Sequence, residues 1–123
     1  MILADTSVWV DHFDSDDADL QSLLDDELVL GHEFVTGELA MGSMRERESV
    51  LLSLRELEQA VTAEPDEVVW FVTQNQLHGL GLSYVDAHLL VSAMLTPGTL
   101  LWTRDRTLLQ AAQRLGLCAD HLR

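Results

Sequence analysis

Short apolar runs along the chain alternate with longer segments in which apolar residues recur every three or four positions. Short runs are typical of buried strands, whereas the longer spacing is typical of helices with one apolar face. The chain is therefore expected to alternate between strands and helices. Three runs predict strands and a fourth could add an edge strand: Met1–Ala4, Leu28–Leu30, Thr99–Trp102 and, at the edge, Leu117–Ala119.

Helical spacing places helices between these strands, with hydroxyl, Asp or Pro residues near their starts and Gly or Pro near several ends. This alternation predicts an α/β fold in a single domain of residues 1–123, with a small, mainly parallel sheet covered by helices on both faces. The predicted helices are Val8–Phe13, Leu20–Leu24, Glu33–Met41, Ser49–Ala60, Pro65 to the turn at 78–81, Ser83 to Pro97, and Asp105 to Gly116, while Asp14–Asp19 is predicted to be a solvated loop.

The charge balance is strongly acidic, with 21 Asp and Glu residues against seven Arg and no Lys, for a formal net charge of −14. A protein that binds nucleic acid by neutralising phosphates usually presents a basic face. Any nucleic-acid role must therefore depend on bound metal and a few local Arg residues, and the overall field is better suited to a basic protein partner. No apolar stretch reaches the roughly 20 residues of a membrane span, and the N-terminus lacks a secretory signal pattern, which predicts a soluble intracellular protein.

Two Asp residues stand at or just beyond the ends of predicted strands. Asp5 follows the first strand, and Asp105 lies shortly after the strand that ends at Trp102. Ligands of parallel sheets bind outside the carboxyl ends of the strands, so these side chains are expected to converge there. Helix N-capping is the alternative for both, because Asp accepts amide hydrogen bonds at that position.

Glu38 and Asp86 complete a set of four candidate acids. Glu38 shares a helical face with Phe34, Val35 and Met41, where an unpaired buried carboxylate would be costly. The alternative is a Glu at the rim of that apolar stripe. Asp86 lies three residues after Ser83, which is the spacing of a capping box. Four acids brought together need a cation, and Mg²⁺ or Mn²⁺ is the natural occupant.

Four segments of the chain resemble, in order, the four motifs of PIN domains, specifically those of the VapC toxins of VapBC toxin–antitoxin pairs. The resemblance implies a three-layer α/β/α fold and an endoribonuclease dependent on Mg²⁺ or Mn²⁺. It also implies that Asp5, Glu38, Asp86 and Asp105 are the catalytic and metal-binding residues, with Thr6, Ser7 and Thr103 in supporting roles. The segments are MILADTSVWVDHF, VTGELAMG, LGLSYVDAHLLVSA and LLWTRDRTLLQAA.

The resemblance further implies a cytoplasmic toxin that forms a homodimer and a hetero-oligomer with a VapB-type antitoxin. The antitoxin's C-terminal segment would wrap the toxin and present basic residues to the acidic pocket. Arg104 and Arg106 flank Asp105 and are predicted to hold RNA phosphates near the metal. The alternative for both is a solvated position in a first helical turn.

Two other classes of protein compete with this interpretation. A non-catalytic PIN-like scaffold would share the fold, but it would have no need of all four acids. An aspartyl phosphotransfer protein would also place an Asp after its first strand. The chain has no Lys to bind the phosphate, and Ser7 stands where the phosphatases of that class have a second Asp.

Overall fold

Three short parallel strands form the centre of the structure, a computed structural model that describes residues 1–123. They are β1 (Ile2–Ala4), β2 (Val29–Leu30) and β3 (Leu100–Trp102), in the order β2-β1-β3. Their residues are buried apart from a partly exposed Leu100, as expected of parallel strands covered on both faces. The three predicted strands are confirmed.

The predicted fourth strand at Leu117–Ala119 is wrong as a strand. It contributes a single parallel bridge between Cys118 and Leu101, closed by hydrogen bonds from Leu101 N–H to Leu117 O (2.7 Å) and from Ala119 N–H to Leu101 O (3.0 Å). Asp120 N–H then bonds back to the Cys118 carbonyl, so the chain turns before a second pair can form.

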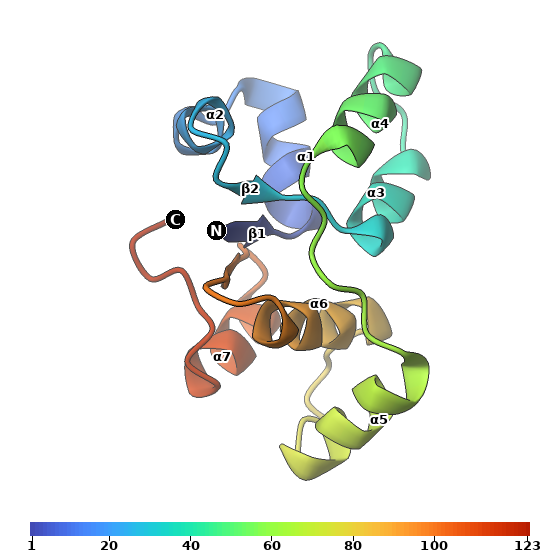
Figure 1. The fold of residues 1–123 in the computed structure, drawn as a ribbon, viewed down its shortest axis with the longest axis vertical. Coiled ribbons are helices and arrows are strands. Elements are labelled where there is room, and N and C mark those ends of the chain that lie inside the picture. The colour runs from blue at the N-terminus through green and yellow to red at the C-terminus, as the bar shows by residue number, and fades with distance from the viewer.

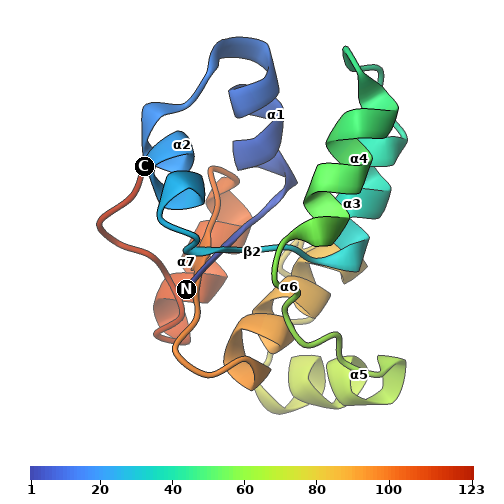
Figure 2. The ribbon, with the colours of Figure 1, turned by 45° about the horizontal axis from the view of Figure 1, so that its top comes forward.

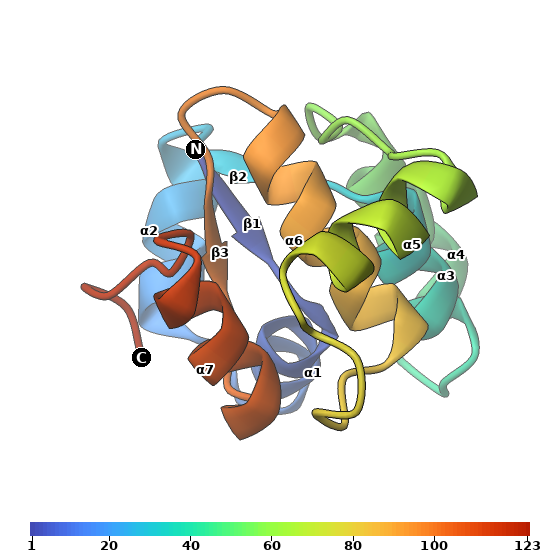
Figure 3. The same cartoon turned by 90° about the horizontal axis from the view of Figure 1, so that it is seen from below.

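Seven helices cover the sheet in two layers (Figure 1). Helices α1 to α4 lie on one side, with α3 and α4 side by side as a pair (Figures 1 and 2). On the other side α6 and α7 lie beneath the sheet, and α5 packs outside α6 (Figure 3). The three-layer α/β/α arrangement is therefore confirmed. The bounds are α1 Thr6–Ser15, α2 Ala18–Asp25, α3 Glu33–Ala40, α4 Arg47–Glu56, α5 Pro65–Gln74, α6 Tyr84–Leu95 and α7 Arg106–Arg114.

The solvated loop predicted at residues 14–19 is mostly helical. Helix α1 continues to Ser15, and α2 begins at Ala18 with Asp17 as its N-cap, accepting the Leu20 N–H at 2.9 Å. The acidic composition indicated solvent exposure correctly for most of the stretch. It did not indicate the backbone conformation, since Asp is as much a helix-capping residue as a loop residue.

Two helices end earlier along the chain than the sequence pattern predicts. Helix α4 ends at Glu56 rather than residue 60, and α5 ends at Gln74 rather than at the turn near residue 78. After α4 the backbone becomes extended and bonds to the end of β2 through Gly31, which removes residues 58–60 from the helix. None of the helices is both long enough and apolar enough to cross a membrane.

Gly31 is the point of closest approach between β2 and the segment after α4. Its N–H donates to the Glu58 carbonyl and its carbonyl accepts from the Ala60 N–H, both at 2.8 Å. A Cβ at this position would lie 2.9 Å from the Leu54 carbonyl oxygen and would also collide with the Gln59 side chain. The backbone oxygen belongs to a helix and cannot easily move aside.

The substitution Gly31→Ala is therefore expected to lower the free energy of unfolding by about 1–3 kcal/mol, the usual cost of overpacking. Gly37→Ala is the matched control, because nothing lies within 4 Å of its added Cβ in the middle of α3. That variant should gain up to about 1 kcal/mol from the better helix propensity of Ala. Urea unfolding of both variants measures the difference, and an unchanged Gly31→Ala stability would contradict the close approach.

Candidate metal centre

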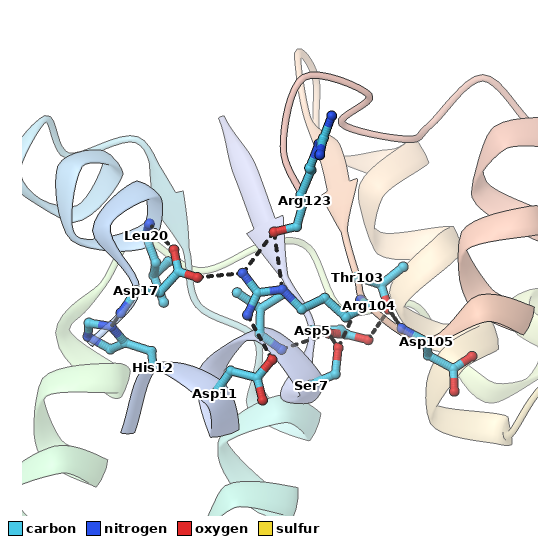
Figure 4. Close-up of polar contacts among 11 residues, drawn as sticks. Asp5, Ser7, Asp11, His12, Asp17, Leu20, Thr103, Arg104, Asp105 and Arg123 are labelled. Carbon is cyan, nitrogen blue, oxygen red and sulfur yellow. Dashed lines mark hydrogen bonds and ion pairs between the residues drawn. The ribbon is translucent and has the colours of Figure 1, made fainter. Parts of the chain in front are cut away.

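The carboxyl ends of β1 and β3 bring Asp5 and Thr103 together. Ala4 lies opposite Trp102 in the register of the two strands, and Asp5 N–H donates to the Trp102 carbonyl at 2.9 Å. The Asp5 carboxylate lies between two hydroxyls (Figure 4). Thr103 Oγ1 donates to Oδ2 and Ser7 Oγ donates to Oδ1, each at 2.5 Å.

Asp5 is both a helix cap and a buried acid. Its Oδ1 accepts the Val8 N–H at 3.3 Å, so the capping alternative is realised. The residue is only 5% exposed, and loss of solvation raises the pKa of its carboxyl group despite the lowering effect of the Ser7 and Thr103 hydroxyls. A cation nearby would favour the charged form of such a group, and carboxylate oxygens have lone pairs left to bind one.

Asp105 is joined to this network through the same hydroxyl. Its backbone N–H donates to Thr103 Oγ1 at 3.0 Å, so Thr103 bonds to Asp5 with its hydrogen and to Asp105 with its oxygen. The Asp105 side chain is exposed and caps α7 by accepting the Leu108 N–H at 2.9 Å. Its second oxygen makes no hydrogen bond to the protein.

Glu38 approaches the site from α3, where Oε1 accepts a 2.6 Å hydrogen bond from Thr6 Oγ1. The prediction that Glu38 lies buried on an apolar face is wrong. Glu38 is exposed and Met41 is 88% exposed, because α3 turns Val35 and Leu39 toward the core instead. The rim alternative describes its burial correctly, and Thr6 places it beside the start of α1.

Asp86 makes none of its hydrogen bonds to the hydroxyls that contact the other three acids. It forms the capping box that the spacing predicted, accepting the Ser83 N–H at 3.1 Å and donating its own N–H to Ser83 Oγ at 3.0 Å. Its carboxylate uses Oδ2 for that bond, and no hydrogen bond joins it to the supporting hydroxyls. Helix capping is therefore better defined by the structure than metal binding as the role of Asp86.

Hydrogen bonds thus link Asp5 to Asp105 through the Thr103 hydroxyl, whereas Glu38 bonds separately to Thr6, the residue that follows Asp5. Each of Thr6, Ser7 and Thr103 bonds to one of these acids, as supporting residues would. No three carboxylate, histidine or cysteine side chains are close enough in this arrangement to hold a metal ion. A shared cation would need Glu38, Asp86 and Asp105 to turn toward Asp5, and the exposed positions of Glu38 and Asp105 leave those two free to do so.

The two arginines predicted to bind RNA have different surroundings. Arg106 is exposed and makes no hydrogen bond through its side chain. The Arg104 guanidinium instead pairs with Asp11, at 2.8 Å, and with Asp17 (Figure 4). The sequence does not indicate that Asp11 and Asp17 are partners of Arg104. The available signals were the capping position of Asp17 before Leu20 and the four-residue spacing from Ser7 to Asp11, neither of which points to Arg104.

Comparison with known proteins defines the class. Residues 2–114 match the PIN domain. The three-layer α/β/α fold is that of this class, whose nucleases generally use divalent metals.

The chain is similar to Ribonuclease VapC32 of two strains of Mycobacterium tuberculosis, CDC 1551 / Oshkosh and ATCC 25618 / H37Rv. Each is 44% identical over 117 residues, covering 95% of this chain and 94% of the relative. The protein therefore belongs to the VapC family of PIN-domain ribonucleases, and the resemblance found in its four motifs is confirmed.

The donor set fits a hard divalent cation. All four acids offer carboxylate oxygens, which are the ligands that Mg²⁺ and Mn²⁺ prefer, and no cysteine lies among them. The buried Asp5 has both oxygens oriented by hydroxyls, which is the usual outer support of a metal ligand. Asp105 has an oxygen left without a protein partner.

Proposed function

We propose that the protein is an endoribonuclease that hydrolyses RNA phosphodiester bonds with Mg²⁺ or Mn²⁺ held by Asp5, Glu38, Asp86 and Asp105. The observation that carries the proposal is the buried Asp5 carboxylate, fixed between two hydroxyls at the meeting point of β1 and β3. The name of its VapC32 relatives supports RNA as the substrate. A non-catalytic scaffold would need only the helix cap at this position, which an uncharged Asn or Ser supplies without the cost of burying a charge.

Buried and exposed residues of the proposed site have different roles. When bound, the cation supplies an activated water and neutralises charge on the leaving oxygen. Ser7 and Thr103 hold the Asp5 oxygens in one orientation, which removes the reorganisation that a mobile carboxylate would need. Glu38 and Asp105 are exposed, so they lie where a substrate phosphate can approach. Arg106 is the cation available to meet that phosphate.

We further propose that the protein is the toxin of a type II pair and that a VapB-type antitoxin covers this site. An apolar hollow of about 210 Å³ lies between α1, α2 and α4, lined by residues including Trp9, Phe13 and Leu57. A second hollow of about 110 Å³ shares Phe13 with it and reaches Thr6 and Glu38. A segment with apolar side chains followed by a basic one would fill both, and the net charge of −14 favours such a partner.

The proposed activity is tested by incubating the purified protein with total RNA in Mg²⁺, in Mn²⁺ and in EDTA. Cleavage is expected with either metal and should disappear with the chelator, returning when Mg²⁺ is added in excess. The Asp66→Asn variant is a suitable control, since that exposed acid lies on α5, outside the proposed site, and should not alter cleavage. Cleavage that persists in EDTA would contradict the metal requirement.

A further inference from the structure

Arg104 is the most heavily engaged cation of the molecule. Its Nη1 donates to Asp11 on α1 at 2.8 Å, and its Nη2 donates to Asp17, the cap of α2. Nε and Nη2 also donate to the carbonyl of Arg123, at 3.1 and 2.8 Å. The guanidinium lies 5.3 Å from the centre of the Trp102 ring. One side chain thus joins β3, two helices and the C-terminal segment (Figure 4).

The backbone of the same residue reaches the buried acid. Arg104 N–H donates to Ser7 Oγ at 3.0 Å, and Ser7 Oγ donates to Asp5 Oδ1. Ser7 and Asp11 are four residues apart on α1, so they lie on one face of that helix. Arg104 therefore attaches the loop after β3 to α1 at two points, once by its backbone and once by its guanidinium.

These contacts leave Arg104 poorly suited to hold a phosphate. A guanidinium has five N–H groups, and Asp11, Asp17 and the Arg123 carbonyl take up most of them. Two carboxylates also offset its single positive charge. Hydrogen bonds to Asp17 and Asp11 outweigh burial and raise the pKa of Arg104. Burial by itself would raise the pKa of Asp17, but the pairing with Arg104 and the backbone N–H groups of Leu20 and Asp19 together lower it.

We propose that Arg104 is a positioning residue for Asp5 rather than an RNA ligand: by fixing the loop at residues 103–105 against α1 and α2, it sets the hydroxyls of Ser7 and Thr103 that orient the Asp5 carboxylate. The inference rests on the proposed metal-dependent function. It assigns to the ion-paired Arg104 a role in metal affinity, and it leaves Arg106 as the phosphate-binding candidate of this loop.

The test compares Mn²⁺ affinity, by calorimetry with the metal alone, in the wild type, Arg104→Gln and Arg104→Lys. Loss of an outer supporting residue typically weakens metal binding about 10- to 100-fold, and that loss is expected for Arg104→Gln. Removal of a positive charge by itself would act in the opposite direction and tighten Mn²⁺ binding. Arg104→Lys should recover only part of the affinity, because an ammonium cannot span Asp11, Asp17 and Arg123 together.

Asp17→Asn provides a second variant that is expected to fold, since Asn caps a helix as well as Asp does. It weakens the bond to Arg104 and should lower Mn²⁺ affinity by less than Arg104→Gln does, because Asn can still accept a hydrogen bond from the guanidinium. Asp19→Asn makes the same charge change on an exposed residue of α2 without touching Arg104, and Arg114→Gln removes a distant arginine charge on α7. Neither control should alter the affinity by a comparable factor.

Binding of a fluorescein-labelled single-stranded RNA of mixed sequence, measured in the Asp5→Asn background, separates positioning from phosphate contact. If Arg104 positions Asp5, adding Arg104→Gln to Asp5→Asn should leave the RNA affinity within about twofold of that of Asp5→Asn alone. The salt dependence of binding should also be unchanged. A phosphate contact predicts weaker binding with a salt slope reduced by about one, and tighter binding in Asp17→Asn, where the arginine is released.

Two results would overturn the inference: unchanged or tighter Mn²⁺ binding by Arg104→Gln, or a loss of RNA affinity confined to the Arg104 variants. Failure of the proposed function looks different. In that case the wild type itself neither binds Mn²⁺ nor cleaves RNA with Mg²⁺.

Discussion

Asp5→Asn is expected to lower RNA cleavage by at least about 100-fold, the scale on which loss of one preorganised electrostatic group acts. Asn caps helices as well as Asp, so the bond to Val8 N–H at the start of α1 can be kept while the charge is removed. The substitution therefore separates the two roles that the sequence left open. If Asp5 served only as an N-cap, the variant would cleave RNA at the wild-type rate.

The same variant carries a stability prediction of the opposite sign. Burial raises the pKa of Asp5, which means that the folded state disfavours its charged form. At neutral pH the ionised Asp5 therefore costs stability, and this cost fades as the pH falls through the raised pKa toward the unfolded value. Asp5→Asn should be at least as stable as the wild type at pH 7. A fall in both melting temperature and activity would indicate a structural role instead.

Asp105→Asn is the companion variant for activity. It too keeps a helix cap, through Leu108 N–H, and removes one charge. Because Asp105 is exposed, its loss should lower cleavage without the stability gain expected at Asp5. Initial rates with a common RNA and excess Mg²⁺, together with thermal melts at pH 7, distinguish the two positions.

Lowering the pH from 7 to about 4 is expected to destabilise the fold by about 2–3 kcal/mol through His32 alone. His32 is buried, and its surroundings lower its pKa to about 4, mainly by desolvation and further by the nearby His88. The unfolded chain takes up this proton below its ordinary pKa of 6.5, whereas the folded chain resists until about 4. Stability is therefore lost as the pH falls between these two values.

The hydrogen bonds of His32 explain why protonation is unfavourable. Nδ1 accepts the Phe34 N–H at 3.0 Å, so the ring proton is on Nε2, 2.8 Å from Ser92 Oγ. A proton added at Nδ1 would break the cap of α3 and place a charge in the core. Asp5 acts in the opposite direction over part of the range because of its raised pKa, so urea unfolding across pH is best repeated in Asp5→Asn.

His88 gives a second, separable contribution to the same pH dependence. It is buried between the rings of Phe34 and Tyr84, both of its ring nitrogens lack hydrogen-bond partners, and desolvation lowers its pKa although Glu33 opposes this. His88→Leu should reduce the loss of stability at acid pH. It should also raise the free energy of unfolding by about 1–3 kcal/mol, because it removes a buried polar group that has no hydrogen-bond partner. The exposed His78→Gln is the control. Stability independent of pH between 7 and 4, or a His88→Leu profile equal to wild type, would contradict the prediction.

Much of the fold could be predicted because its signals are local. Short apolar runs at the three strands, and helical spacing between them, depend on neighbours within a few residues. The capping bonds of Asp5, Asp86 and Asp105 each span three residues, and local spacing in the sequence indicates all three as alternatives to metal binding. The convergence of Asp5 and Asp105 then followed from a parallel sheet, which places the residues after both strands at the same edge.

The errors concern features that depend on distant parts of the chain. Helical periodicity places Glu38 near Phe34 and Val35, but only packing against α1 and α4 decides which face of α3 is buried. The edge strand at residues 117–119 is shortened by the turn at Asp120. Helix α4 ends early because residues 58–60 bond to the end of β2, more than 25 residues away in the sequence.

The sequence by itself determined the class of fold, the acids at the strand ends and the family to which the chain belongs, since all three depend on short motifs. The tertiary structure decided that Asp5 is buried between two hydroxyls, that Glu38 is exposed, and that Arg104 forms ion pairs with Asp11 and Asp17. These partners are up to 98 residues apart. Burial and ion pairing depend on which side chains the fold brings within a few ångströms, and no local pattern specifies that.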